Sequence, residues 1–427
     1  MPRLLLVTST TGYQAAAFRE AADQLGIPLV LATDRCHQLE DPWRDGALAV
    51  RFEQPEESAR LIVEFAAQNP LDAIVALGDL PTVTAAHAAA LLHLPFHSPE
   101  ATQAARSKFL SRQKYRAAGL AQPWFLRIPM DLPPGDGMRL VLGEHDQPFP
   151  CVLKPLVLSG SRGVIRADDE ASFIAAFRRI RDLLQVPDIR KLRDPEAGYI
   201  LVEDFIPGAE VAVEAIVTRG ELQVLAIFEK ADPLDGPFFE ETIYLTPPRL
   251  SDEKQEAVLG ELRRGVATLG LTYGPVHAEL RLAPAGPVIL EIAARPIGGL
   301  CARALRFVHR ENLISLEELI LRHALGEDIL PIAREPQAAG VMMIPIPGAG
   351  FFERVAGVQA ANAIDGIESL EITAKQGQKL VPLPEGASYL GFIFARSEST
   401  DAVEHALRSA HAKLQFQISP ELKVLRA

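Results

Sequence analysis

The sequence predicts a mixed α/β and α+β protein in which a parallel α/β unit precedes antiparallel sheets. In the first hundred residues, short apolar runs alternate with helical patterns, as in "RLLLVTS" followed by "AAAFREAADQLG". Such alternation indicates parallel strands joined by crossover helices. Further along, "EVAVEAIVTRG" and "LQVLAIFEKAD" have strand-like alternation and meet at a glycine turn, which is typical of an antiparallel sheet.

Four parts follow one another along the chain. The parallel α/β unit covers residues 1–105. Residues 106–190 contain the helical pattern "SKFLSRQKYRAAGL" and the strand pattern "PCVLKPL". Residues 191–333 contain the antiparallel strands, a helix over 252–269 and a hairpin, and the prolines of "LPIAREPQ" mark their end. Residues 334–427, with "YLGFIFARS" and the helical "TDAVEHALRSAHAKL", are predicted to form a small α+β module.

Composition restricts the classes of function. The 427 residues are 48% hydrophobic and 23% charged, as expected of a globular protein with two or three domains. A net charge of −12 argues against a nucleic-acid surface, because binding phosphates in sequence-independent fashion needs a basic face. No run reaches the roughly 18 apolar residues of a membrane span, and the N-terminus lacks the apolar core of a signal peptide. We therefore expect a cytoplasmic protein without nucleic-acid or membrane partners, and the charge neither requires nor excludes a homodimer.

The three cysteines, Cys36, Cys151 and Cys301, lie far apart in the sequence. Their odd number and wide spacing predict neither a disulfide framework nor a zinc cluster. Each is expected to be a small buried residue.

Residues 277–299, "HAELRLAPAGPVILEIAARPIGG", read as a hairpin. A five-residue turn over 283–287 would pair Leu282 with Val288 and would place Glu279 opposite Glu291. Directly opposed side chains lie about 4.5–5.5 Å apart, and like charges there destabilise a sheet. A hard cation such as Mg²⁺, which prefers oxygen ligands, would convert the repulsion into a metal site. The alternative is a solvated polar face, since a one-residue change of register removes the pairing.

A phosphate cradle is predicted in "VLKPLVLSGSRGV". An apolar strand that ends on Lys154 and runs into serines and glycines offers free backbone N–H groups and one fixed positive charge. The order of residues differs from a Walker loop, because the lysine precedes the glycines. The alternative is a flexible surface turn after a lysine whose charged end reaches into solvent.

Further candidates lie in "LVEDFIPGAEVAVE" and in "KADPLDGPFFEETIYLTPP". In the first, Glu203 with its apolar neighbours could form an adenine slot, and Glu210 could accept hydrogen bonds from ribose. The second is a long loop with acids flanked by aromatics, which in a compact domain is functional or mobile. Lys108 and Lys230 are alternative partners for a phosphate. For each of these charged residues the alternative is a solvated surface position.

Taken in order, these motifs resemble those of the ATP-grasp superfamily, and most closely those of L-amino-acid ligases, which join amino acids into dipeptides. The resemblance covers essentially the whole chain. It rests on Lys108 with "AAGLAQPWF", then "VLKP" with its glycine-serine loop, "LVEDFIPGAE", and "HAELRL" followed by "LEIAARPIGG". It also includes "MIPIPGAGFFERVAGV" near the C-terminus. The resemblance implies an ATP-grasp fold, in which 106–190 is the small lobe and 191–333 the large lobe.

The resemblance also implies roles for individual residues. Lys108 and Lys154 would contact the ATP phosphates, and a loop with Ser159, Gly160, Ser161 and Gly163 would close over them. Glu203, Phe205 and Ile206 would line the adenine slot. Glu210 would bind the ribose. Mg²⁺, with Mn²⁺ as the alternative, would be ligated by Glu279 and Glu291. The catalytic residues would be Arg295, which binds the transferring phosphate, and His277, which stabilises or orients the intermediate. Independently of the resemblance, Gly298 and Gly299, which follow Arg295, could present backbone N–H groups to a substrate carboxylate or to the oxyanion.

One position departs from the superfamily's usual pattern. Ala293 stands where most members carry Asn or Asp as a further metal ligand, so the number of metal ions stays open. In the expected pairing Ala293 faces His277, which leaves room for the imidazole beside the carboxylates. The bland alternative for His277 is a hydrogen-bonded structural histidine.

The activity implied is an ATP-dependent carboxylate–amine ligase that forms an acyl phosphate and releases ADP and phosphate. Small-molecule carboxylates and amines, in particular amino acids, would be its partners. Two alternatives remain: a biotin carboxylase-like or other ligase acting on bicarbonate or a non-amino-acid carboxylate, and a nucleotide-binding protein without turnover.

Overall fold

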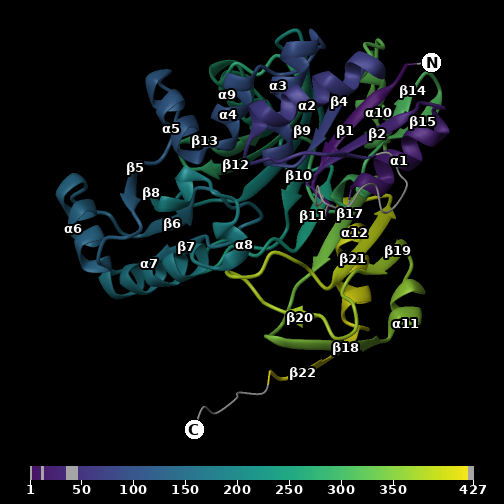
Figure 1. Ribbon diagram of the computed structural model, residues 1–427. Helices are drawn as coiled ribbons and strands as arrows, with labels where there is room; N and C mark the ends of the chain where they lie inside the picture. The colour runs from purple at the N-terminus through teal and green to yellow at the C-terminus, as the bar shows by residue number, and fades with distance from the viewer. Residues whose placement is uncertain (1, 11–13, 35–46, 422–427) are drawn as a thin grey trace.

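The computed structural model describes residues 2–10, 14–34 and 47–421 (Figure 1). Cys36 lies outside these residues, whereas Cys151 and Cys301 are buried as expected. The N-terminal sheet has the order β3-β2-β1-β4 and is parallel throughout. Its strands are β1 (Leu4–Thr8), β2 (Leu29–Thr33), β3 (Leu48–Ala49) and β4 (Ala73–Leu77), with helices α1 (Ala15–Gln24), α2 (Pro55–Gln68) and α3 (Asp79–Leu92). The predicted parallel α/β unit is confirmed.

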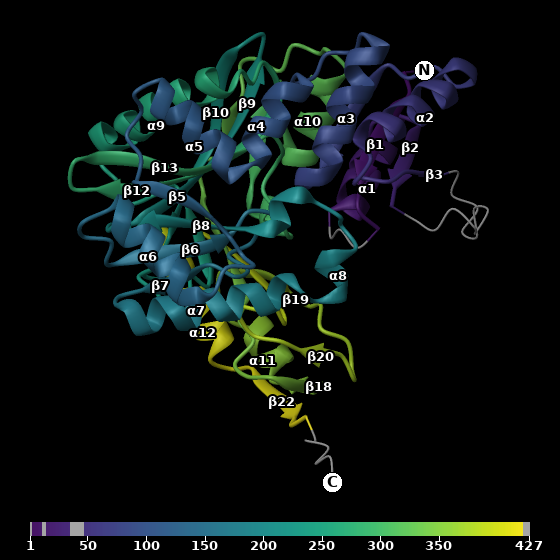
Figure 2. The same cartoon turned by 60° about the vertical axis from the view of Figure 1, so that its left-hand side comes forward.

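The small lobe projects from the rest of the molecule on the left of Figure 1 and comes forward in Figure 2. It follows α4 (Pro99–Arg106) and α5 (Lys108–Ala117). Its antiparallel sheet has the order β5 (Phe125–Pro129), β8 (Tyr199–Asp204), β6 (Cys151–Pro155) and β7 (Ile165–Ala167). The helices of the lobe are α6 (Pro134–Glu144), α7 (Glu170–Leu184) and the short α8 (Pro187–Arg190). Strand β8 lies beyond residue 190, so the boundary expected there does not separate two sheets.

The largest sheet has eight strands in the order β13-β12-β9-β10-β11-β17-β21-β19. Its bounds are β9 (Glu210–Thr218), β10 (Glu221–Lys230), β11 (Ile243–Thr246), β12 (Tyr273–Ala283), β13 (Gly286–Ala293), β17 (Ala338–Ile344), β19 (Ile367–Ile372) and β21 (Gly391–Ser397). Helix α9 (Asp252–Leu269) packs near β13, and α12 (Thr400–His411) packs on β17 and β21. Three strands beyond residue 333 therefore extend the central sheet, so that boundary does not separate two sheets either.

Smaller elements complete the described chain. They are η1 (Pro195–Gly198), η2 (Cys301–Ala304), β14 (Arg306–His309), β15 (Asn312–Ser315), α10 (Leu316–Ala324), β16 (Ala333–Arg334), β18 (Gly350–Ala356), α11 (Val358–Asn362), β20 (Lys379–Leu380) and β22 (Gln415–Ser419). Among the helices of these residues, none is both long and apolar enough to cross a membrane.

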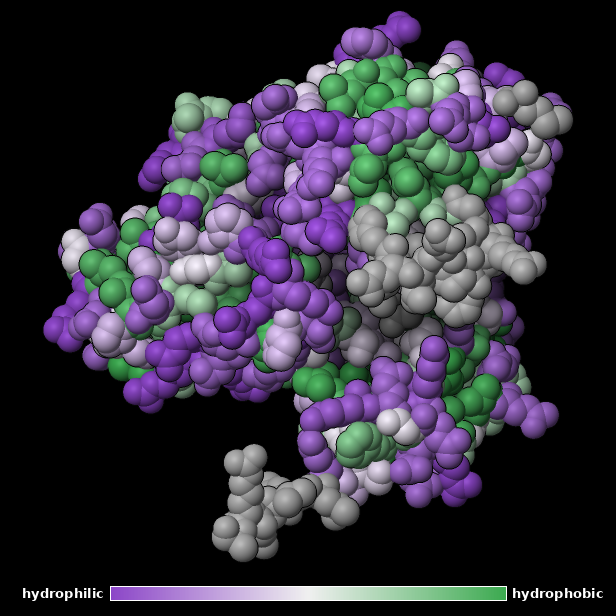
Figure 3. Space-filling view, viewed as in Figure 1, coloured by the Kyte–Doolittle hydropathy of each residue, from purple (hydrophilic) through white to green (hydrophobic). Residues whose placement is uncertain are grey.

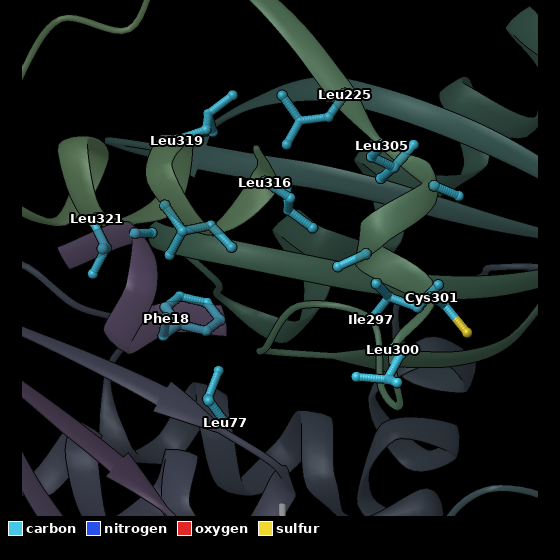
Figure 4. Close-up of a cluster of buried hydrophobic side chains, with 14 of the residues drawn as sticks. Phe18, Leu77, Leu225, Ile297, Leu300, Cys301, Leu305, Leu316, Leu319 and Leu321 are labelled. Carbon is cyan, nitrogen blue, oxygen red and sulfur yellow. The ribbon is translucent and has the colours of Figure 1, made fainter. Parts of the chain in front are cut away.

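A single apolar cluster joins the N-terminal unit to the central sheet (Figure 4). Phe18 of α1 and Leu77 of β4 pack in the same cluster as Leu319 of α10. The cluster also contains Ile297 and Leu300, which follow β13. Burying such side chains contributes roughly 1.5–3 kcal/mol each. The N-terminal unit thereby holds in place the loop that carries Arg295.

The β12–β13 hairpin differs from the expected one at its turn. Ala283 pairs with Gly286, so the turn has two residues and the five-residue turn is wrong. Leu280 pairs with Ile289, and the next pair is Glu279 with Glu291. The extra residue, Leu290, is a β-bulge, which adds one residue to one strand and shifts the register there. The shift restores the predicted opposition of the two glutamates and of His277 with Ala293.

Gly208 makes a local stability prediction possible. Its φ is +115°, and a Cβ at this position would lie 2.2 Å from the backbone oxygen of Leu282. Because both the conformation and the space exclude a side chain, Gly208→Ala should lower the free energy of unfolding by about 2 kcal/mol or more. Urea denaturation would measure the loss. Gly143→Ala, in α6 with nothing within 4 Å of the added Cβ, is the matched control; an equal loss in both variants would contradict the argument.

Candidate active site

One cavity brings together nearly all of the predicted site residues. It has a volume of about 330 Å³, and Figure 3 shows a recess between the small lobe and the rest of the molecule. The predicted residues that line the cavity are Lys108, Lys154, Ser159, Gly160, Ser161, Glu203, Phe205, Ile206, Glu210, His277, Glu279, Glu291, Arg295, Gly298 and Gly299. Gly163 instead lies behind the loop, where its backbone N–H donates to the carbonyl oxygen of Pro384 at 2.7 Å.

Two lysines reach the cavity from different elements. Lys108 begins α5, and its Nζ lies 3.1 Å from the Glu291 carboxylate. Burial by itself lowers the pKa of Lys108, but the charges of Glu291 and Asp79 outweigh burial and raise the pKa. Lys154 lies in β6 and pairs with Glu203, yet burial keeps the pKa of Lys154 below its ordinary value. The cavity therefore has two ammonium groups in poorly solvated positions, where an anionic ligand gains most.

Behind Lys154 lies Arg112, whose side chain is 1% exposed. Its Nε donates to Glu203 at 2.7 Å, and its Nη1 and Nη2 donate to the carbonyls of Ile289 and Leu290 at 2.8 and 3.1 Å. Burial raises the pKa of Glu203, but the charges of Arg112 and Lys154 lower it to about 2. The Glu203 carboxylate is thus engaged by two cations and fixes Lys154. Arg112 also binds the carbonyls at the bulge that orients Glu291.

Lys230 lies among three carboxylates. Its Nζ is 2.5 Å from Glu210, 2.5 Å from Glu241 and 3.0 Å from Glu279. The ammonium therefore occupies the centre of an acidic cluster that could otherwise hold a metal ion. The charge of Lys230 is thus compensated by three carboxylates of the chain itself. Burial raises the pKa of Glu241 to about 7, although the charge of Lys230 opposes this.

The two predicted metal ligands face each other across β12 and β13 and both line the cavity. Their side chains are only 22% and 27% exposed, so the solvated polar face is wrong. Each has a lysine beside it, Lys230 at Glu279 and Lys108 at Glu291. Two carboxylates on one cavity wall, opposite each other on neighbouring strands, are a donor set that suits Mg²⁺.

His277 is held by the buried carboxylate of Glu214. Its Nδ1 hydrogen-bonds to Glu214, whose other oxygen accepts the backbone N–H of Ile297 at 3.1 Å. Its Nε2 lies 3.6 Å from Glu279. Burial lowers the pKa of His277, but the charges of Glu214 and Glu279 raise it to about 9. The two carboxylates therefore favour the protonated imidazole, which can donate to developing negative charge on an oxygen.

Arg295 receives its orientation from the N-terminal unit. Its Nε donates to Asp79, the first residue of α3, at 2.7 Å, and its Nη1 donates to the carbonyl of Pro296 at 3.1 Å. Gln14 also reaches across and hydrogen-bonds to the carbonyl of Ile297. The remaining guanidinium edge lines the cavity.

An apolar slot lies near the small lobe. Phe205 and Phe239 stack with ring centroids 6.4 Å apart, and the Arg281 guanidinium lies 5.1 Å from the Phe205 centroid. Leu290, the bulge residue, lines the cavity beside Glu291. Glu210 borders this region, with one oxygen near Lys230 and the other 3.1 Å from Arg281. The walls suit a flat aromatic ring, as the sequence predicted for adenine.

Several residues at the site were not singled out from the sequence. Those that line the cavity include Phe239, Glu241, Tyr244, Leu290, Met343 and Tyr389. Phe239, Glu241 and Tyr244 lie in the long loop-rich stretch that was expected to be functional or mobile. Arg112 and Asp79 act from behind the cavity. The sequence contains a partial indication for Arg112, because it stands four residues after Lys108 and therefore on the same helix face.

Comparison with known families agrees with this geometry. A model described as the ATP-grasp domain matches residues 147–304, one described as the ATP-grasp N-terminal domain matches 19–96, and one described as the L-amino acid ligase C-terminal domain 2 matches 342–419. This chain belongs to the ATP-grasp superfamily. Apart from Lys108, the residues that line the cavity come from two of the matched regions, 147–304 and 342–419.

Individual relatives narrow the resemblance. The crystal structure of L-amino acid ligase from Bacillus licheniformis superposes with a TM-score of 0.81 at 25% identity, covering 98% of this chain and 99% of that one. Alanine–anticapsin ligase of Bacillus subtilis (strain 168) is 27% identical over 57% of this chain and 52% of its own. Dapdiamide A synthase of Enterobacter agglomerans is 28% identical over 47% and 44%. The chain spans about half the length of these two curated relatives.

Proposed function

We propose that this ATP-grasp protein is an ATP-dependent ligase that joins the carboxylate of one amino acid to the amine of another. The observation that carries the proposal is the single cavity in which Lys108, Lys154 and Arg295 face the opposed pair Glu279 and Glu291. Phosphoryl transfer requires mainly positioning and charge compensation, which this set supplies. The names of the similar ligases support amino acids as substrates.

In this proposal the carboxylate substrate is phosphorylated by ATP, and the amine attacks the acyl phosphate. Phe205, Ile206 and the stacked Phe239 hold the adenine. The loop of Ser159, Gly160 and Ser161 covers the phosphates with its backbone N–H groups. Glu210, held by two cations, accepts from ribose with its remaining lone pairs.

The metal would be held by Glu279 and Glu291. When bound, Mg²⁺ supplies positive charge to the phosphate oxygens. Arg295 binds the transferring phosphoryl group through the edge that Asp79 leaves free. The protonated His277 donates to the oxyanion formed when the amine adds, and Gly298 and Gly299 offer N–H groups beside it. Because ATP itself activates the substrate carboxylate and the amine is the second nucleophile, no protein nucleophile is needed.

A substrate screen tests the proposal. ADP release should rise at least about tenfold over the basal rate when suitable amino acids are added singly or in pairs, and mass spectrometry should identify a dipeptide. Bicarbonate with biotin is the comparison arm for the rival ligase reading, and nucleotide alone is the blank. Nucleotide binding with no stimulation by any amino acid, or stimulation by bicarbonate only, would contradict the proposal.

A further inference from the structure

The segment 382–389, between β20 and β21, contacts residues 159–163, the loop that is proposed to cover the phosphates and is called the phosphate loop below. The N–H of Gly163 donates to the carbonyl of Pro384 at 2.7 Å, and Nε of Arg162 donates to the carbonyl of Glu385 at 2.8 Å. The Glu385 carboxylate in turn accepts two N–H groups of Arg179 in α7, one of them at 2.8 Å. The loop of the small lobe is therefore bound to residues that lie just before β21 of the central sheet, far from the loop in the sequence.

The same segment also forms part of the cavity wall. Ala387 and Tyr389 line the cavity together with Met343 and Cys301. Tyr389 packs against the apolar cluster that contains the latter two residues, and its ring meets Phe392 edge-on at 6.1 Å. Sulfur atoms of Cys301 and Met343 lie 3.7 Å apart. This wall is apolar and polarisable, in contrast to the charged wall made by Glu279 and Glu291.

We propose that segment 382–389 recognises an apolar side chain of the amino-acid substrate through Tyr389 and couples this recognition to closure of the phosphate loop. The inference rests on the proposed ligase function and adds a substrate class and a specificity-determining residue to it. An apolar side chain keeps the wall dry, whereas a polar one would lose its hydrogen bonds to water without gaining enough partners. When the apolar side chain of the substrate binds, it fixes the position of Tyr389. This effect is transmitted along the segment to Pro384 and Glu385.

Coupling of this kind is reciprocal. If the amino acid strengthens nucleotide binding by some factor, the nucleotide strengthens amino-acid binding by the same factor. The contacts to Gly163, Arg162 and Arg179 are the physical link, because they join the small lobe to the segment that carries Tyr389. Weakening them should reduce the coupling factor and leave each ligand's separate site intact.

The first experiment measures side-chain preference. Wild-type protein should use leucine or methionine at least about tenfold better, as kcat/KM, than asparagine or glutamine, which are of similar size. Tyr389→Ala should reduce this ratio to about threefold or less by removing one face of the pocket, and Tyr389→Phe should retain it. An unchanged ratio in Tyr389→Ala would overturn the inference. Absence of stimulation by every amino acid in the wild type would instead refute the proposed function, so the two failures are distinct.

The second experiment measures coupling. The Kd of a non-hydrolysable ATP analogue with Mg²⁺ is determined by calorimetry, with and without the preferred amino acid. The wild type should bind the analogue at least about fivefold more tightly when the amino acid is present. Glu385→Gln should lower this factor to about twofold or less. Glu371→Gln, which breaks the similarly exposed pair with Arg303, is the matched control and should keep the wild-type factor. Equal coupling in wild type and Glu385→Gln would overturn the link.

Discussion

Replacing Glu279 or Glu291 by glutamine should reduce Mg²⁺-dependent ADP release by at least about 100-fold in kcat/KM. Each carboxylate provides charge and oxygen that an amide of the same shape provides only in part, and loss of one preorganised charged group typically costs this much. Removing the Glu279 charge also leaves Lys230 and His277 with fewer acidic partners. A coupled assay over a Mg²⁺ titration measures the loss.

The outcome can be separated from general damage. Glu221→Gln, at the exposed start of β10, is a control that should keep wild-type turnover. Circular dichroism should give the same helix content for all three variants. Wild-type ADP release in both Glu279→Gln and Glu291→Gln would exclude the metal assignment.

Arg112→Met should have the largest effect on stability. The substitution removes four hydrogen bonds and leaves Glu203 buried with Lys154 as its one remaining cation. Breaking a buried ion pair by removing one partner typically costs about 3–5 kcal/mol. Urea denaturation measures this loss, and the same variant should lose ADP release, because the bulge that orients Glu291 loses its support.

A double-mutant cycle identifies the cause. Glu203→Gln should cost less stability in the Arg112→Met background than in the wild type, because the Arg112–Glu203 pair is already lost there and only Lys154 then loses its carboxylate. Arg112→Lys, which keeps the charge but cannot reach the two carbonyls together with the carboxylate, should fall between wild type and Arg112→Met. Stabilities that add without any coupling would rule out the shared network.

The hairpin illustrates how far sequence reasoning extends. The opposition of Glu279 and Glu291 was predicted correctly, but from a turn of the wrong length. A turn of Pro284 and Ala285 alone would have placed Leu290 opposite Glu279, and only the bulge returns Glu291 to the cavity face. The bulge depends on Arg112, whose helix lies more than 170 residues earlier. The alternation of residues within the hairpin cannot predict a contact with a side chain so distant in the sequence.

The predicted parts of the chain show a similar limit. The segment "YLGFIFARS" contains β21, but a pattern of alternation does not tell which sheet a strand joins. Strand β8 pairs with β5 and β6 of the small lobe, and β17 pairs with β11 of the central sheet. Motif order, by contrast, identified about half of the residues that line the cavity, because the residues with charged or glycine-rich signals come together there.

The bond between Asp79 and Arg295 has a consequence for protein engineering. The two residues come from regions matched by different family models, 19–96 and 147–304, so they are natural candidates for separation in a chimaera. A graft that exchanges the first hundred residues for those of a relative must therefore bring a carboxylate to the start of its third helix. Otherwise the guanidinium keeps only its hydrogen bond to the carbonyl of Pro296, and we expect a recombinant that carries every other motif to lose activity.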